Sequence, residues 1–126
     1  MDLNQITLPT RDAKAAIDFY TRLGLKLIVD SPTNGYARFE TPSGDATLSV
    51  HETPEPFVNP TTIYFEVEDV DRIYGNLKEK GFRFDLMPTD QKWGWREARL
   101  RDPDGTVICI FHGGENRKNP PWRVKD

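Results

Sequence analysis

Two glutamates are the side chains of this chain with the clearest capacity for acid–base chemistry. Glu66 and Glu97 each stand in a stretch in which polar and apolar residues alternate. Two carboxylates held close together raise the pKa of one of them, which can then act as a general acid or base. The alternative is that both form salt bridges with arginines on the same face, for which Arg38, Arg99 and Arg101 are available.

His51 and Cys109 are the other candidates for chemistry. His51 is a candidate catalytic residue or a contact to a bound molecule, although a lone histidine is more often hydrogen-bonded or solvated than a metal ligand. Cys109 is the only cysteine. It becomes a reactive thiolate only beside a positive charge, and otherwise it is a small buried thiol that fills space. A single cysteine forms no internal disulfide and agrees with a reducing compartment, so we expect a cytoplasmic protein.

Two tryptophans offer a flat binding surface. Trp93 and Trp95 flank Gly94 in the segment DQKWGWRE, where the glycine permits a tight bend. Rings at the edge of a site stack on a flat ligand or on a cation. The alternatives are that the tryptophans cover the edge of the core or form a dimer contact.

These residues belong to a sequence that repeats itself. Asp12 and Asp69 lie 57 positions apart, as do Gly24 and Gly81 (69 − 12 and 81 − 24), and each pair brackets an amphipathic run. An aspartate before such a run is typical of a helix N-cap, and a glycine after it is typical of a helix end. We therefore predict two βαβββ modules within one domain of residues 1–126.

The predicted elements follow the same plan in both modules. In module one, residues 3–51, the strands are Leu3–Pro9, Leu25–Val29, Tyr36–Glu40 and Ala46–His51. In module two, residues 62–112, they are Thr62–Val67, Phe82–Met87, Trp95–Arg101 and Thr106–Phe111. A Pro-rich connector covers residues 52–61, and the tail 113–126 is predicted to be irregular, with Trp122 either pinned to the body or loose.

Strand alternation divides the side chains between two faces. The predicted fold class is α+β, with the two modules forming a curved, cup-shaped mixed sheet and the helices on its convex face. The concave face carries polar and aromatic side chains that we take as ligand-binding candidates: Gln5, Tyr36, Arg38, Ser49, His51, Thr62, Tyr64, Glu66, Trp95, Glu97, Arg99, Cys109 and Phe111, with Trp93 at the rim. The alternative is an ordinary solvent-facing sheet.

The paired arms, with RDAKAAIDFYTRLGL and EDVDRIYGNLKEKGF as helices and RDPDGTVICIF as the closing strand, resemble the vicinal oxygen chelate superfamily, which includes glyoxalase I, extradiol dioxygenases and bleomycin-binding proteins. Enzymes of this group hold a divalent metal with His and Glu from the first and last strands of each arm. The resemblance places Gln5, Ser49, Thr62 and Cys109 at those positions. An amide, two hydroxyls and a thiol are a poor ligand set, so we expect no metal and no cofactor.

The resemblance to the bleomycin-binding branch implies a metal-free protein, with a role in antibiotic resistance, that binds a small aromatic or cationic molecule in the cup. One alternative is a glyoxalase-type lyase, isomerase or dioxygenase that uses atypical metal ligands or Glu66, Glu97 and His51. The other is a partner-binding domain. The net charge of −3 and the lack of a long apolar run argue against nucleic-acid and membrane partners. We expect a homodimer, as is common in the family.

Overall fold

The computed structural model describes residues 1–54, 57–59 and 61–125, which form two compact units. The first unit comprises Met1–Pro60 together with Asp102–Gly105, and the second comprises Thr61–Arg101 together with Thr106–Asp126. Each unit contains one predicted βαβββ module, except that the DPDG turn of module two belongs to the first unit.

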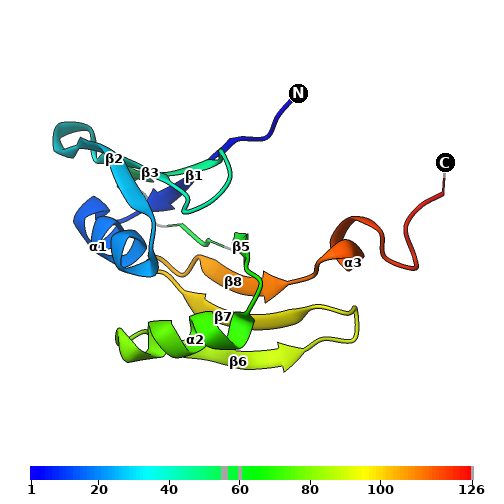
Figure 1. The fold of residues 1–126 in the computed structure, drawn as a ribbon. Coiled ribbons are helices and arrows are strands. Elements are labelled where there is room, and N and C mark those ends of the chain that lie inside the picture. Colours follow the sequence, from blue (N-terminus) through cyan, green and yellow to red (C-terminus); the bar gives the residue numbers. More distant parts are fainter. Residues whose placement is uncertain (55–56, 60, 126) are drawn as a thin grey trace. The chain divides into compact units, whose positions relative to one another are not determined.

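The first unit is a four-stranded mixed sheet with one helix on one face (Figure 1). Its elements are β1 (Gln5–Thr10), α1 (Ala13–Leu23), β2 (Lys26–Ser31), the 3-10 turn η1 (Pro32–Asn34), β3 (Tyr36–Glu40) and β4 (Thr47–Glu52). The strand order is β1-β4-β3-β2, in which only the β1–β4 pair is parallel. Tyr20, Phe39 and Val50, each at most 1% exposed, lie in the core.

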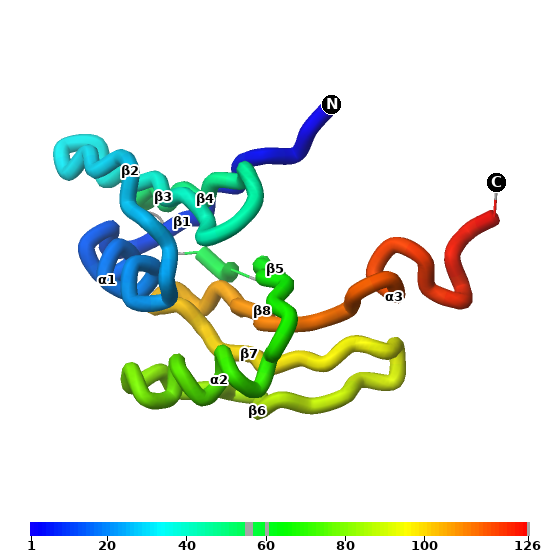
Figure 2. The backbone as a smooth tube through the Cα atoms, in the orientation of Figure 1, coloured from blue at the N-terminus to red at the C-terminus, as the bar shows by residue number. Residues whose placement is uncertain are grey.

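The second unit repeats this architecture. Its elements are β5 (Thr62–Glu66), α2 (Val70–Glu79), β6 (Phe84–Asp90), β7 (Arg96–Arg101), β8 (Val107–His112) and α3 (Glu115–Lys118). The strand order β5-β8-β7-β6 matches that of the first sheet, again with one parallel pair, β5–β8. The tube in Figure 2 shows β6 and β7 as a long hairpin, with the chain continuing from β8 into α3.

The two helices begin and end where the aspartates and glycines predict. The Asp12 carboxylate accepts hydrogen bonds from two backbone amides of the first turn of α1, and the Asp69 carboxylate accepts one from the first turn of α2. These bonds satisfy donors that a helix start leaves open. Gly24 and Gly81 have φ values of 121° and 93°, which a residue with a Cβ rarely adopts.

The DPDG turn is held in the first unit by buried carboxylates. Asp104, 8% exposed, accepts a hydrogen bond of 2.6 Å from the Thr10 hydroxyl and one of 2.8 Å from the Arg11 amide. Asp102, 6% exposed, accepts a hydrogen bond of 2.6 Å from the hydroxyl of Tyr20. Burial and the neighbouring Asp102 charge raise the pKa of Tyr20, which therefore stays protonated and acts as the donor.

The structure confirms the α+β class and the two βαβββ modules. Their hydrogen bonding forms two four-stranded sheets, and the joined cup and the single domain stay predictions. Residues 55, 56 and 60 of the predicted connector lie outside the described residues. Among the described helices, none combines the length and the apolar character that crossing a lipid bilayer requires.

Three predicted details are wrong. The strand expected from Phe82 begins at Phe84, because the Phe82 amide donates to the carbonyl of Leu77 and so completes the end of α2. Trp95 is not in a strand, because its carbonyl accepts the Gln91 amide and closes the β6–β7 turn. The tail is not wholly irregular: it contains α3, while Trp122 is 63% exposed and does not pin it.

Replacing Tyr20 with Phe tests the attachment of the DPDG turn. The substitution removes the hydroxyl bonded to Asp102 and leaves that buried carboxylate with one donor fewer, so we expect a loss of about 1–3 kcal/mol in the free energy of unfolding, measured by urea denaturation. The control is Tyr74→Phe, since the Tyr74 hydroxyl makes no hydrogen bond among the described residues. Equal effects of the two substitutions would contradict the prediction.

Candidate functional site

The second unit has one sheet face packed on α2 and an opposite face rich in polar and aromatic groups. On β7 and β8, the buried side chains of Ala98, Leu100, Ile108 and Ile110 alternate with Glu97, Arg99, Cys109 and Phe111. Alternation places these two sets on opposite faces of the sheet. We name the second set, together with Tyr64, Trp93 and Trp95, the aromatic–arginine face.

Strand register brings the members of this face together. Across the β7–β8 pair, Arg99 lies opposite Cys109 and Glu97 lies opposite Phe111. Across the parallel β5–β8 pair, Tyr64 also lies opposite Cys109. Cys109 is therefore the centre of the face, with Tyr64 on one neighbouring strand and Arg99 on the other.

Glu97 is a buried carboxylate with a donor on each oxygen. Its side chain is 1% exposed. Oε1 accepts hydrogen bonds from Nε and Nη2 of Arg99, at 3.1 and 3.0 Å, and Oε2 accepts one of 3.0 Å from the indole nitrogen of Trp93. A buried charge without such partners would be strongly destabilising, so Arg99 and Trp93 make it possible to keep a carboxylate here.

Arg99 is the partner of Glu97 that reaches solvent. Its side chain is 30% exposed, and its guanidinium carbon lies 5.9 Å from the centroid of the Tyr64 ring. Burial opposes the charged form, but the hydrogen bonds with Glu97 outweigh it and raise the pKa of Arg99. This side chain is therefore a fixed positive charge at the surface of the face.

Three aromatic rings form the rest of the face. Trp95 stacks on Phe111, with a centroid distance of 4.5 Å and an interplanar angle of 24°. Tyr64 meets both rings edge-on, at 5.6 Å from Phe111 and 6.1 Å from Trp95. Gly113 has room for no side chain, because a Cβ there would lie 2.9 Å from the Trp95 indole nitrogen. Phe111 and Gly113 together fix the position of Trp95.

Cys109 lies beneath this surface as a buried thiol. It is fully buried, and burial together with the nearby Glu97 carboxylate raises its pKa to about 12, against the opposing effect of Arg99. A buried thiol with a raised pKa is mostly protonated at neutral pH and is a weak nucleophile. Of the two interpretations left open by the sequence, the structure favours the space-filling thiol.

Glu66 serves the C-terminal segment and does not join Glu97. Its carboxylate accepts hydrogen bonds of 2.8 Å from the amides of both Gly113 and Gly114 and pairs with Arg117 at 3.3 Å. Desolvation opposes ionisation, but these partners outweigh it and lower the pKa of Glu66. Of the two alternatives that the sequence left open, pairing with arginines therefore describes both glutamates: Glu97 pairs with Arg99, and Glu66 pairs with Arg117, which was not among the arginines considered.

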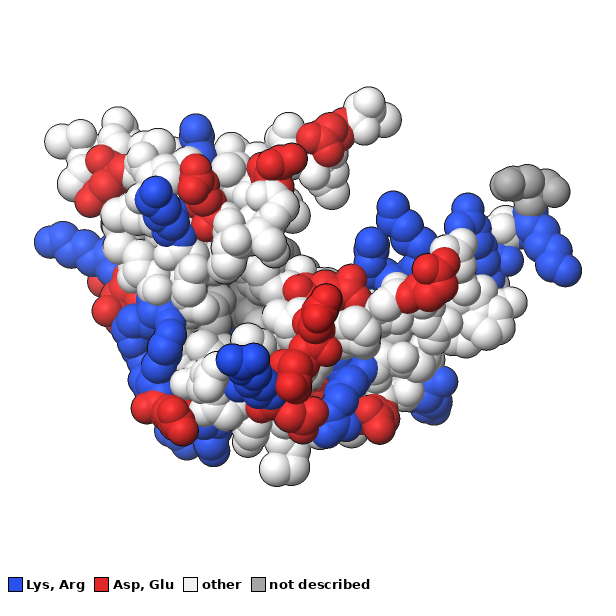
Figure 3. Space-filling model, in the orientation of Figure 1, with Lys and Arg blue, Asp and Glu red and all other residues white. Residues whose placement is uncertain are grey.

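The C-terminal segment that Glu66 holds is basic. Asn116 donates a hydrogen bond of 3.0 Å to the carbonyl of Trp93, which ties the segment to the β6–β7 turn as well. Figure 3 shows Lys and Arg side chains gathered over this segment. The basic residues of the segment are Arg117, Lys118, Arg123 and Lys125.

The first unit carries a smaller polar cluster of its own. The hydroxyl of Tyr36 lies 2.9 Å from Ser49 Oγ and accepts a hydrogen bond of 2.9 Å from Arg38 Nε. The bond with Ser49, and then the interaction with Arg38, lower the pKa of Tyr36 despite partial desolvation. His51 packs edge-on against the Tyr36 ring at 6.0 Å. Gln5 accepts a hydrogen bond of 2.9 Å from the Thr47 hydroxyl.

The residues at the family's metal positions do not fit a divalent ion. Ser49 is hydrogen-bonded to Tyr36, Gln5 is hydrogen-bonded to Thr47, and Cys109 is fully buried. Thr62 offers a neutral hydroxyl at the start of β5. Among the described residues, no group of three or more His, Cys, Asp or Glu side chains is arranged to hold a metal ion.

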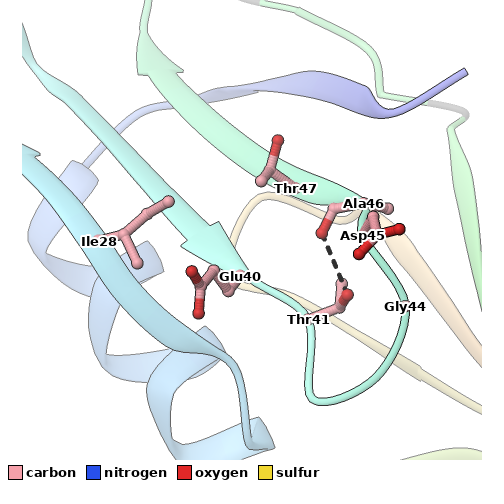
Figure 4. A pocket seen from close by; sticks show the side chains of 7 residues that line it. All are labelled: Ile28, Glu40, Thr41, Gly44, Asp45, Ala46 and Thr47. Carbon is pink, nitrogen blue, oxygen red and sulfur yellow. Dashed lines mark hydrogen bonds between the residues drawn. The ribbon is translucent and has the colours of Figure 1, made fainter.

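A hollow of about 290 Å³ lies elsewhere in the first unit (Figure 4). It is bordered by β2, the end of β3 and the turn that leads into β4, where the Thr41 hydroxyl donates to the Ala46 carbonyl at 3.1 Å. Its lining consists of Ile28, Glu40, Thr41, Gly44, Asp45, Ala46 and Thr47. This lining includes no aromatic ring and no predicted site residue, so the hollow adds nothing to the candidate site.

Three contributors to the site were not predicted from the sequence. They are the bond from the Trp93 indole to Glu97, the amides of Gly113 and Gly114 that bind Glu66, and the ion pair of Glu66 with Arg117. The Gly-Gly pair directly after β8 is the signal that could have been used, because adjacent glycines expose amides that a carboxylate can approach.

Comparison with known proteins agrees with this fold. The sequence model of the Glyoxalase/Bleomycin resistance protein/Dioxygenase superfamily matches residues 2–110. The uncharacterized protein YraH of Bacillus subtilis (strain 168) is 34% identical over 125 residues, which cover 88% of this chain and 98% of that protein.

Solved structures show the same similarity. A glyoxalase/bleomycin resistance protein/dioxygenase from Nocardioides superposes with a TM-score of 0.80 at 24% identity, covering 99% of this chain and 90% of the other. A bleomycin-binding protein complexed with bleomycin superposes with a TM-score of 0.72 at 25% identity, covering 90% of this chain and 99% of the other.

The thiol of Cys109 is predicted to be unreactive in the folded protein. Burial and the Glu97 carboxylate raise its pKa to about 12, so almost no thiolate is present at pH 8. Labelling with a disulfide reagent that releases a coloured thiol should be negligible for the native protein. It should reach one equivalent in guanidinium chloride, which serves as the internal control. Rapid native labelling would show that the thiol is exposed or activated.

Replacing Glu66 with Gln is predicted to destabilise the protein in a pH-dependent manner. The folded-state pKa of Glu66 is lowered from its ordinary value of 4.5, so its contribution is complete above pH 4.5 and is lost as the pH falls through the folded-state pKa. The difference in urea midpoint between the wild type and Glu66→Gln should therefore be largest near pH 7 and shrink below about pH 4.5.

Glu68→Gln is the matched control for this series, because Glu68 is exposed and forms no described contact. A difference for Glu66→Gln that stays constant from pH 7 to pH 3 would mean that ionisation of Glu66 does not stabilise the fold.

Proposed function

Since this chain belongs to the Glyoxalase/Bleomycin resistance protein/Dioxygenase superfamily, we propose that it binds a small organic molecule with a flat ring, without a metal ion, through the aromatic–arginine face. The observation that carries the proposal is the cluster of Tyr64, Trp95 and Phe111 beside the partly exposed Arg99. Small-molecule sites combine apolar walls with a few fixed polar groups that orient the ligand.

The ligand set at the family's metal positions supports binding without a metal. The donors there are an amide, two hydroxyls and a single thiol, with no imidazole and no carboxylate. A divalent ion in this fold would need imidazole or carboxylate donors. Metal-dependent lyase or dioxygenase chemistry is therefore the weaker candidate.

The state of the carboxylates supports binding over acid–base turnover. Glu97 uses both oxygens on Arg99 and Trp93, and Glu66 uses its carboxylate on the C-terminal segment. A general base must be free to reach the proton of a substrate.

In addition, the structure of a bleomycin-binding protein has been solved with bleomycin bound, and this chain shares its fold. We include in the proposal a protective role, in which the protein sequesters a toxic compound.

Tryptophan fluorescence provides the test. In a Trp122→Phe background, emission comes from Trp93 and Trp95, and a panel of flat aromatic compounds should quench it in a saturable manner. Trp95→Ala should weaken binding about tenfold, the loss expected for one stacked ring. Elemental analysis of the purified protein should find no stoichiometric transition metal.

Two results would overturn the proposal. The first is the absence of saturable quenching across flat compounds of every charge. The second is dissociation of an oligomer by Trp95→Ala with no effect on any ligand, which size-exclusion chromatography would reveal and which would favour the partner-binding alternative.

A further inference from the structure

We infer that the ligand of the aromatic–arginine face is an aromatic acid, a flat ring with a carboxylate or comparable anion attached, and that Arg99 receives the anion. This inference rests on the proposed function and assigns a negative charge to the ligand proposed there. It departs from the expectation of a cationic ligand that the sequence allowed.

The first reason is the difference in burial between the negative charge of Glu97 and the positive charge of Arg99. Glu97 is 1% exposed and Arg99 is 30% exposed, so the negative member of the pair is buried and the positive member is at the surface. An incoming ligand therefore meets the guanidinium first. Electrostatic attraction at short range depends on the nearest charge, particularly where burial limits screening by water.

The second reason is that the carboxylates of Glu97 and Glu66 already have hydrogen-bond and ion-pair partners. A cation that sought Glu97 would have to displace Arg99 from Oε1 or the Trp93 indole from Oε2. Glu66 on β5, which β8 separates from β7, is likewise occupied by two backbone amides and Arg117. Neither carboxylate can bind a cationic ligand without breaking bonds that the fold uses.

The spacing of the rings and the guanidinium gives the third reason. The Tyr64 ring lies 5.9 Å from the guanidinium carbon of Arg99, 5.6 Å from the Phe111 ring and 6.1 Å from the Trp95 ring. Tyr64 thus borders both the charge and the stacked pair. A ligand whose anion is joined directly to its ring, or through one or two carbon atoms, has the dimensions to contact both.

Glu97 also prepares Arg99 for an anion. Two of the guanidinium nitrogens, Nε and Nη2, are fixed by Oε1 of Glu97. A guanidinium that is already oriented loses little conformational entropy when it binds a planar anion. The buried carboxylate is thus a positioning group for Arg99.

Three probes with the same ring and different charges test the inference by titration calorimetry: 2-naphthoate, 2-naphthamide and 2-naphthyltrimethylammonium. We expect 2-naphthoate to bind about tenfold more tightly than 2-naphthamide, the gain of one hydrogen bond to a charged group, and the ammonium compound to bind most weakly. The preference for 2-naphthoate should fall as the salt concentration rises.

The double variant Glu97→Gln with Arg99→Gln tests whether Arg99 is the residue that binds the anion. It removes both charges together, so no buried charge is left unpaired, and circular dichroism checks that it folds. We expect it to bind 2-naphthoate and 2-naphthamide with equal affinity. Arg101→Gln is the matched control, because Arg101 lies on the same strand and pairs with Asp85, and this variant should keep the tenfold preference.

The outcomes separate this inference from the proposed function. Equal binding of the three probes, or tightest binding of the ammonium compound, would overturn the inference that the ligand is an anion, while the proposal that the face binds a ring would stand. No binding of any probe, together with no quenching across the compound panel, would remove the proposed function itself. If the double variant does not fold, the wild-type probe series alone decides the charge of the ligand.

Discussion

In the second unit, the buried carboxylate of Glu97 must have hydrogen-bond donors around it, and the arrangement of the candidate site follows from this requirement. Glu97 is almost wholly removed from water, and a charge in that position is tolerated only when donors surround it. Arg99 and the Trp93 indole supply them, so the same bonds fix the orientation of a guanidinium at the surface and of a ring at the β6–β7 turn. The binding chemistry that we propose is therefore a consequence of how the structure satisfies this carboxylate.

A second carboxylate extends the same principle to the chain end. Glu66 binds the amides that follow β8 and the side chain of Arg117, and so holds the start of the C-terminal segment. Asn116 in that segment bonds to the Trp93 carbonyl, and Gly113 packs against Trp95. The positions of both tryptophans thus depend on residues beyond the second module as the sequence defines it.

The first unit uses buried carboxylates for a different purpose. Asp102 and Asp104 belong to the turn between β7 and β8, yet their partners are Tyr20, Thr10 and the Arg11 amide of the first unit. The DPDG turn of module two therefore uses its carboxylates to stabilise the first unit. In this superfamily member the acidic groups are used to hold structure, and the residues at the usual metal positions carry no charge.

The sequence by itself determined the two modules, both helix caps and the division of strand residues between faces. These follow from local rules: Asp12 and Asp69 satisfy helix amides within a few residues, and strand alternation has a fixed period of two. Only the tertiary structure decided which partner each charged group takes. Trp93 and Glu97 are close in sequence, but their hydrogen bond depends on the geometry of the β6–β7 turn. Glu66 contacts Gly113 and Arg117, which lie 47 and 51 positions later in the sequence. Such pairings depend on the three-dimensional path of the backbone, which the residue types and their spacing do not specify.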